Sequence, residues 1–219
     1  MDPQEYDQWY QTPRGSWIGR LEYRILFEAL NPRPEESILD IGCGTGFFTR
    51  CFARDQTGTV AGIDPDPNTI EYATAHRADN ETYAVGSGED VPFPPKSFDF
   101  TVAVTSLCFV EDQIGVLQEM ARVSKKKVAV GLLNRNSILW LQKGKGGGKG
   151  AYAGAHWHTR SEVIGLFNAA GLPHPNIKTA LYFPSGSMPA RLAESILPGS
   201  FYWGSFMLAV SISTEQENS

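Results

Sequence analysis

The sequence holds few cysteines, no surplus of basic residues and no long apolar run. Its three cysteines are an odd number without a CxxC pair, which argues against a disulfide framework and a cysteine-rich zinc site. Lys and Arg total 19 against 24 Asp and Glu, so the net charge of −5 argues against wholesale electrostatic binding to nucleic acid or anionic lipid. These absences favour reduced thiols, and they predict neither a metal site nor a nucleic-acid partner.

The apolar runs are too short to span a bilayer, which takes about 20 residues. The longest of them, around residues 101–110 and 206–210, have the length of a strand. The N-terminus is polar and aromatic, unlike a secretory signal. We therefore expect a soluble, cytoplasmic protein with no membrane partner, and the 219 residues predict one domain over 1–219.

Short apolar segments alternate with segments of helical periodicity along most of the chain. Strands are predicted at residues 37–41, 59–63, 82–85, 98–104, 128–133, 177–181 and 206–212. Helices are predicted at residues 16–30, 47–54, 67–78, 113–123 and 161–170. This alternation predicts an α/β fold: a Rossmann-like, mostly parallel seven-stranded sheet with helices on both faces and a small cap.

Two segments depart from this alternation of strands and helices. Residues 134–160 include the run KGKGGGKG at 143–150, which is too rich in glycine for regular structure and predicts a mobile insertion or lid. Its lysines are typical of a solvated loop, and the run lacks the residues of a P-loop. Residues 1–30 offer aromatic side chains and are expected to form an N-terminal cap segment.

The strongest motif is the run ILDIGCGTG at residues 38–46, a buried strand that ends in a glycine turn. Glycines let the backbone approach a ligand closely, and the carboxyl edge of a doubly wound sheet is where ligands bind. Residue 47 is Phe, so the G-x-G-x-x-G fingerprint of dinucleotide binding is incomplete. Asp64 ends the next strand, where a carboxylate can bind ribose hydroxyls, and Pro65 can lie flat on a purine.

Three blocks of the chain resemble the class I S-adenosylmethionine-dependent methyltransferases, and specifically small-molecule enzymes similar to those of ubiquinone and menaquinone biosynthesis. The blocks are LDIGCGTG at 39–46, VAGIDPDPNTIEYA at 60–73 and GSGEDVPFPPKSFDFTVAVTSL at 86–107. The resemblance runs from about Ser37 to Leu133. It implies methyl transfer from S-adenosyl-L-methionine to a small-molecule acceptor, with S-adenosylhomocysteine as product.

The resemblance also implies roles for single residues. Asp40 and the glycine turn would hold the methionine part of the cofactor, Asp64 would take the ribose hydroxyls, and adenine would lie between Pro65 and residues 87–89. Ser87 stands where the family usually has Asp, so the contact to the adenine amino group is expected to be weaker or to move, for instance to Asp90. The implied cofactor-binding set is Asp40, Gly42, Cys43, Gly44, Gly46, Asp64, Pro65, Ser87, Gly88, Glu89 and Thr105.

The acceptor site has no comparable motif. The residues predicted to form it are Tyr6, Trp9, Tyr10, Arg14, Ser106 and Phe109. The methyl group of a sulfonium is already activated, so a general base is optional, and its candidates are His156, His158 and Tyr10. Two histidines two residues apart lack a third metal ligand, and a structural or surface role stays open for them.

Two other functions stay open at this point. A nicotinamide-dependent Rossmann oxidoreductase would use Asp64, although the third fingerprint glycine is missing. A non-catalytic binder of S-adenosylmethionine would keep the pocket without turnover. The sequence leaves room for a homodimer.

Overall fold

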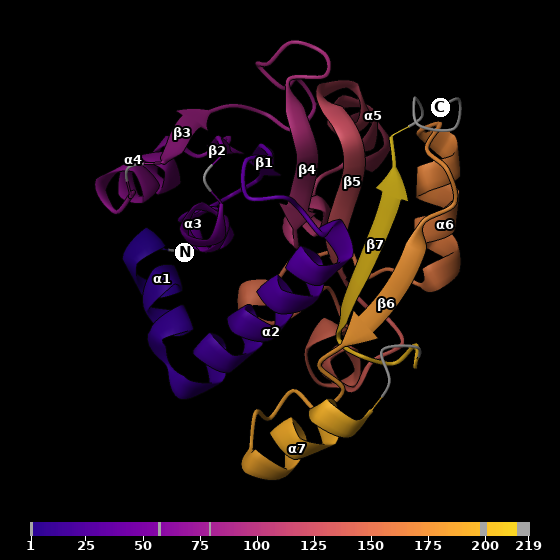
Figure 1. The fold of residues 1–219 in the computed structure, drawn as a ribbon. Helices are drawn as coiled ribbons and strands as arrows, with labels where there is room; N and C mark the ends of the chain where they lie inside the picture. Colours follow the sequence, from indigo (N-terminus) through magenta and orange to yellow (C-terminus); the bar gives the residue numbers. More distant parts are fainter. Residues whose placement is uncertain (1, 57, 79, 198–200, 214–219) are drawn as a thin grey trace.

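A seven-stranded sheet organises the computed structural model, which describes residues 2–56, 58–78, 80–197 and 201–213 (Figure 1). The strands are β1 (Ile38–Ile41), β2 (Val60–Asp64), β3 (Glu81–Val85), β4 (Phe98–Val104), β5 (Ser124–Leu133), β6 (Asn176–Ala180) and β7 (Phe206–Ile212). The helices are α1 (Pro3–Gln11), α2 (Pro13–Leu30), α3 (Phe47–Asp55), α4 (Pro67–Ala75), α5 (Gln113–Val123), α6 (Arg160–Ala169) and α7 (Met188–Ile196). All seven predicted strands are found, which confirms the predicted α/β class.

The strand order is β3-β2-β1-β4-β5-β7-β6. Strands β1 to β5 pair in parallel, whereas β7 pairs antiparallel with both β5 and β6. The chain winds outward in one direction from β1 to β3 and in the other from β4 onward. The topological switch therefore lies between β1 and β4, where open α/β sheets bind ligands beyond the carboxyl ends of their strands.

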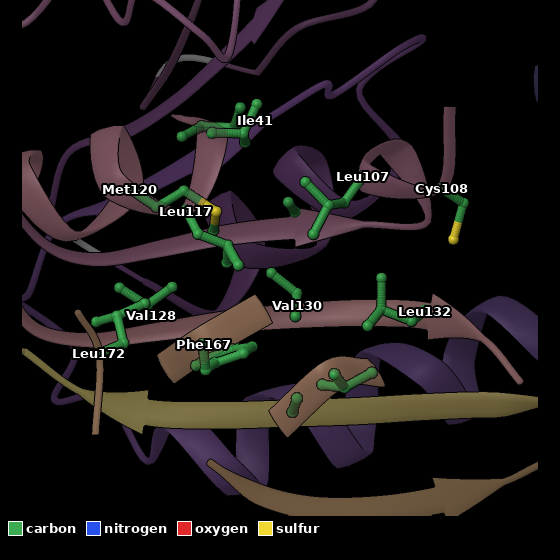
Figure 2. Close-up of a cluster of buried hydrophobic side chains, with 14 of the residues drawn as sticks. Ile41, Leu107, Cys108, Leu117, Met120, Val128, Val130, Leu132, Phe167 and Leu172 are labelled. Carbon is green, nitrogen blue, oxygen red and sulfur yellow. The ribbon is translucent and has the colours of Figure 1, made fainter. Parts of the chain in front are cut away.

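Helices cover both faces of the sheet, so its central strands are buried on both sides. All four residues of β1 are buried, and successive residues point to opposite faces: Ile38 belongs to one apolar cluster and Leu39 to the other. Figure 2 shows the second cluster, in which Met120 of α5 and Phe167 of α6 pack against Val128 and Val130 of β5. The opposite cluster packs α2 and α3 against the sheet.

The cap segment forms two helices where only one was predicted. The prediction began at residue 16, but α2 begins at Pro13 and α1 precedes it. Each helix has a proline in its first turn, and a side chain caps each N-terminus: Asp2 accepts from the Gln4 amide and Thr12 from the Gly15 amide. The aspartate and threonine before the prolines were the signals that could have revealed both boundaries.

Strand β5 begins four residues before the predicted start at Val128. The prediction missed the start of the strand because a run of lysines is typical of a solvated loop. In the structure, Lys126 forms an ion pair with Glu36, and Lys127 Nζ donates to the carbonyls of Ala29 and Leu30 at 3.1 and 2.8 Å. The second interaction places a cation at the C-terminus of α2, where the free carbonyl groups favour it.

Two further differences concern segments rich in glycine and proline. The insertion 134–160 was expected to lack regular structure, but it contains the π-helical turn η2 (Trp140–Gly144) and the 3-10 turn η3 (Gly150–Tyr152). The connection before β7 contains α7, which stands away from the sheet in Figure 1. Among the described residues, no helix is both long and apolar enough to cross a bilayer.

Because α2 packs on the sheet, shortening its buried side chains should lower the unfolding free energy substantially. Leu26 has no solvent exposure, so Leu26→Ala should lower the unfolding free energy by about 2–5 kcal/mol through lost burial and a residual cavity. Leu141→Ala is the matched control, because Leu141 is 57% exposed, and it should change that free energy by less than about 0.5 kcal/mol. Urea unfolding of both variants measures this. Equal losses of unfolding free energy in the two variants would mean that packing of α2 against the sheet does not stabilise the fold.

Candidate functional site

A cavity of about 770 Å³ opens at the carboxyl edge of the sheet, on the switch point between β1 and β4. It lies in the size range of small-molecule sites. Loops after β1, β2, β3 and β4 form its floor, and α1 forms part of its wall. Of the residues predicted to bind the cofactor, it is lined by Asp40, Gly42, Cys43, Gly44, Asp64, Pro65, Ser87, Gly88, Glu89 and Thr105.

The glycine turn is held in a conformation that side chains rarely adopt. Gly42, Gly44 and Gly46 have φ angles of 71°, 51° and 81°. A Cβ on Gly42 would overlap Ser106, whereas one on Gly44 would meet nothing within 4 Å. The Gly44 backbone therefore faces open cavity space. Gly46 is the N-cap of α3, and it lies outside the residues that line the cavity.

Two carboxylates flank this turn. Asp40 at the end of β1 is buried, its Oδ2 accepts a hydrogen bond from Thr49 Oγ1 at 2.7 Å, and burial raises its pKa to about 7. Asp64 at the end of β2 accepts from the Gly44 amide at 2.9 Å through Oδ2. Its Oδ1 accepts from the Asp66 amide at 3.0 Å and from Thr69 Oγ1 at 3.2 Å. Asp64 is thus fixed against the glycine turn while still lining the cavity.

The turn at residues 87–89, which follows β3, also lines the cavity. Ser87 Oγ accepts from the Glu89 amide at 3.1 Å, so the hydroxyl is used within the turn. Gly88 packs closely against Ile41: a Cβ added to Gly88 would lie 2.9 Å from the Ile41 side chain. Asp90, proposed from sequence as a replacement contact for adenine, does not line the cavity, and Glu89 does. The carboxylate at this wall is therefore that of Glu89.

Thr105, at the end of β4, has a φ angle of 61°, which is strained for a β-branched residue. Strained backbone of this kind concentrates at functional sites. The next residue, Ser106, donates from Oγ to the Ile41 carbonyl at 2.8 Å and ties the ends of β4 and β1 together. Phe109, in the 3-10 turn η1 (Ser106–Phe109), is half exposed and also lines the cavity.

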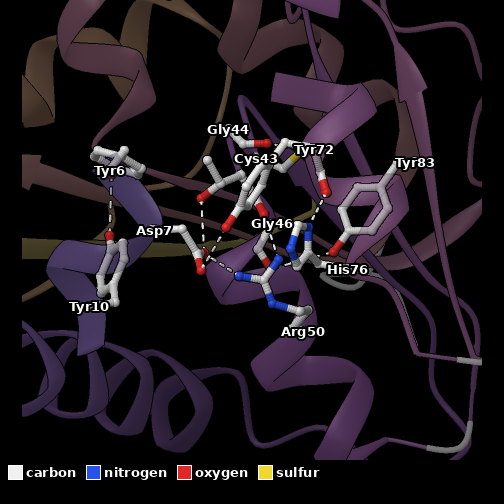
Figure 3. A network of polar contacts seen from close by, with 11 residues as sticks. Tyr6, Asp7, Tyr10, Cys43, Gly44, Gly46, Arg50, Tyr72, His76 and Tyr83 are labelled. Atoms are coloured by element: carbon white, nitrogen blue, oxygen red, sulfur yellow. Dashed lines mark hydrogen bonds and ion pairs between the residues drawn. The ribbon is translucent and has the colours of Figure 1, made fainter. Parts of the chain in front are cut away.

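A polar network that sequence reasoning missed fastens α1 over the site (Figure 3). Asp7 of α1 forms an ion pair with Arg50 of α3 at 2.5 Å, and it accepts from Thr45 Oγ1 and the Tyr72 hydroxyl, each at 3.4 Å. Arg50 also donates to the Thr45 carbonyl at 2.5 Å. The cap is therefore attached to the glycine turn itself. No local motif marks Asp7, because its partners lie 38 to 65 residues away.

A second cavity of about 780 Å³ lies beneath the cap and shares part of its wall with the first. The shared residues are Tyr6, Tyr10, Thr105 and Phe109. Trp9 and Arg14 line only the second cavity, and Ser106 lines only the first. The structure thus brings all six residues predicted for the acceptor site to two adjoining cavities. Lys143, Lys149 and Tyr152 from the insertion complete the second one.

The two candidate histidines do not reach either cavity. His158 is fully buried, its Nε2 lies 3.0 Å from Gln113 Oε1, and burial lowers its pKa to about 4. His156 is exposed and packs edge-on against His158. Neither is among the residues that line the cavities, so the geometry gives the predicted base role no support. Of the three candidates, Tyr10 alone lines a cavity wall.

Comparisons with known proteins agree with this geometry. Residues 39–130 match the methyltransferase domain family. An uncharacterised protein of Methanocaldococcus jannaschii is 29% identical over 80% of each chain. A demethylmenaquinone methyltransferase of Tropheryma whipplei is 43% identical over 47% of this chain and 43% of its own. The chain thus spans less than half the length of the latter.

The fold comparison extends over nearly the whole chain. A crystal structure of a SAM-dependent methyltransferase from Thermotoga maritima, described as a possible histamine N-methyltransferase, is 26% identical with a TM-score of 0.72. The match covers 96% of this chain and 95% of that one. Together these matches confirm the predicted resemblance to class I S-adenosylmethionine-dependent methyltransferases and the predicted fold. They give no support to the nicotinamide-dependent oxidoreductase.

The Asp7 network predicts that the cap loosens when its ion pair is removed. Asp7→Asn should speed amide hydrogen exchange in α1 several-fold, because α1 loses its charged link to α3 and the glycine turn. Global stability should fall by less than about 1 kcal/mol, as for other partly exposed pairs. Asp2→Asn is the control, since its side chain caps α1 and an Asn oxygen can still accept that bond. Unchanged exchange in Asp7→Asn would show that aromatic packing alone holds the cap.

Proposed function

We propose that the protein transfers a methyl group from S-adenosyl-L-methionine to a small-molecule acceptor, which accords with the match of residues 39–130 to the methyltransferase domain family. The first cavity would hold the cofactor and the second the acceptor. The observation that carries this proposal is the convergence of Asp40, Asp64 and the open backbone of Gly44 on one cavity of suitable size.

The residues of the first cavity fit the cofactor part by part. Asp40, which is buried and lines the cavity, would take the methionine amino group. Asp64 accepts three hydrogen bonds, so about one of its four lone-pair sites, on Oδ2, stays free for a ribose hydroxyl. Pro65 and the turn of Ser87 to Glu89 would hold adenine, with the Glu89 carboxylate as a polar partner.

Catalysis would rest on alignment and water exclusion. When bound, the cofactor supplies a methyl group on a sulfonium that is already a good leaving group. Thr105 and Phe109, in the wall common to both cavities, would set the approach of the acceptor, and Tyr6 and Tyr10 of the cap would exclude water. Alignment of this kind can supply about 7–11 kcal/mol in favourable systems.

The relatives do not determine the acceptor. Their names refer to demethylmenaquinone, to malonyl-[acyl-carrier protein] and to nocamycin. The acceptor-side segments of this chain, residues 1–30 and 134–160, lie outside the matched domain. The acceptor of this protein therefore has to be inferred from its own second cavity.

The remaining features of the proposal concern the whole molecule. We place the protein in the cytoplasm, which suits its three free cysteines, two of them buried. Residues 1–219 would act as one methyltransferase domain with residues 1–30 as its cap. A small molecule rather than nucleic acid is the acceptor that suits the acidic net charge. The exposed Met188 and Ile196 of α7 are the surface that would serve a homodimer.

The cofactor assignment is tested by calorimetric titration with S-adenosylhomocysteine and, separately, with NADH. We expect micromolar binding of S-adenosylhomocysteine alone, and Asp64→Ala should weaken it at least about tenfold through loss of the ribose contacts. Asp90→Ala is the control, since Asp90 is exposed outside the cavity, and it should bind like the wild type. Binding of NADH, or of neither ligand, would refute the assignment.

The raised pKa of Asp40 predicts a pH dependence of cofactor binding. An ammonium ligand binds the ionised carboxylate, so affinity for S-adenosylhomocysteine should rise as pH increases through about 7 and then level off. Thr49→Val removes the hydrogen bond that favours the ionised form, so the levelling should move to higher pH. Titrations between pH values near 6 and 8.5 check this, with Thr74→Val on the exposed side of α4 as control. Identical pH profiles for all three proteins would contradict a role for Asp40.

A further inference from the structure

The inner end of the second cavity holds two buried polar side chains without a partner. Glu22 of α2 is 9% exposed, and within the described part of the chain no residue forms a hydrogen bond or an ion pair with its carboxyl group. Ser205, which precedes β7, is 2% exposed, and its Oγ also lacks a partner. Buried polar groups are normally satisfied. The Glu22 carboxyl group lines the cavity and, unlike Ser205 Oγ, is not closed off from it, so it indicates a site for a polar ligand.

The surroundings of Glu22 are aromatic. The hydroxyls of Tyr6 and Tyr10 of α1 lie 3.3 Å apart, and both tyrosines line the cavity with Glu22, as does Tyr152 of the insertion. Burial without a cation raises the pKa of Glu22 to about 8. A carboxyl group among aromatic rings suits a cationic nitrogen, which gains both an ion pair and contact with ring faces.

The charge pattern changes toward the outside of the same cavity. Arg14, Lys143 and Lys149 line it and are exposed, and Glu5 is the exposed acidic residue among them. A second positive charge on the ligand would meet these three cations. The cavity therefore suits a molecule with one protonated nitrogen at its inner end and a neutral or anionic outer end.

We propose that the second cavity binds an amine acceptor, whose protonated nitrogen is held by the Glu22 carboxylate. This inference rests on the proposed function. Glu22 would then also receive the proton that the nitrogen loses: an N–H bond breaks, an O–H bond forms on the carboxyl group, and the nitrogen keeps the lone pair that methyl transfer needs.

Binding of an ammonium ligand should therefore release a proton that can be measured. Near pH 7 the free Glu22 is mostly protonated, so ion pairing with an ammonium group releases its proton to the solvent. The other titratable or charged groups that face this cavity are Glu5, Tyr6 and Tyr10 from α1, Arg14 from α2, and Lys143, Lys149 and Tyr152 from the insertion. Loss of the proton release in Glu22→Gln would attribute the released proton to Glu22 rather than to one of these groups.

The test uses two probes of matched shape that the aromatic walls would accept, 2-phenylethylamine and 2-phenylethanol. Each is titrated calorimetrically into the full chain at pH 7, with and without saturating S-adenosylhomocysteine, in two buffers of different ionisation enthalpy. We expect the amine to bind at least about tenfold more tightly than the alcohol, with release of close to one proton per amine bound. Glu22→Gln should abolish both the preference and the proton release.

Glu28→Gln is the matched control, because Glu28 is exposed on the same helix, and it should behave like the wild type. Folding of Glu22→Gln is checked by unfolding at several pH values. The raised pKa of Glu22 lowers wild-type stability as pH rises from about 4.5 through about 8, and the variant should lack that part of the decline.

Equal affinity for the two probes, absence of amine binding, or a preference retained in Glu22→Gln would overturn the inference. Failure of S-adenosylhomocysteine to bind in the same experiment would instead refute the proposed function. In that case the amine preference, measured without the cofactor product, would still decide the chemistry of the second cavity.

Discussion

The site depends on how the ends of β1 and β2 are joined by the glycine turn. The amides of Gly42 and Cys43 both donate to the Ile63 carbonyl, at 2.8 and 2.9 Å, and the Gly44 amide donates to the Asp64 carboxylate. These bonds require positive φ angles at Gly42 and Gly44. They set the positions of Asp40 and Asp64 on either side of one cavity. Helix α1 depends on the same turn, because Asp7 binds Thr45 within the turn and Arg50 in α3, which follows it.

The parts of this arrangement that follow from local sequence were predictable. Buried apolar runs gave the strands, and the residues that end β1, β2 and β4 had to meet at one edge once the sheet was parallel. Ten of the eleven residues assigned to the cofactor line the first cavity. Gly46 does not, because its positive φ serves the start of α3, next to the ring of Tyr83. A glycine pattern alone does not separate these two uses.

The parts that depend on distant contacts were not predictable. Asp7 and Glu22 are ordinary acidic residues in helical segments, and only folding places Asp7 on Arg50 and Glu22 in the second cavity. The histidines show the same dependence: their place beside the glycine-rich stretch suggested a base, and only folding places His158 in the interior beside Gln113 and Cys108. Under the proposed function, the sheet edge would bind the cofactor, and the cap with the insertion would bind the acceptor.

The most direct test of this account is a crystal structure of the protein with S-adenosylhomocysteine. The account predicts the homocysteine amino group beside Asp40, the ribose on Asp64, and adenine between Pro65 and residues 87–89, with the sulfur facing the wall shared by the two cavities. Binding of the ligand in any other place, or with its sulfur directed away from Thr105 and Phe109, would contradict it.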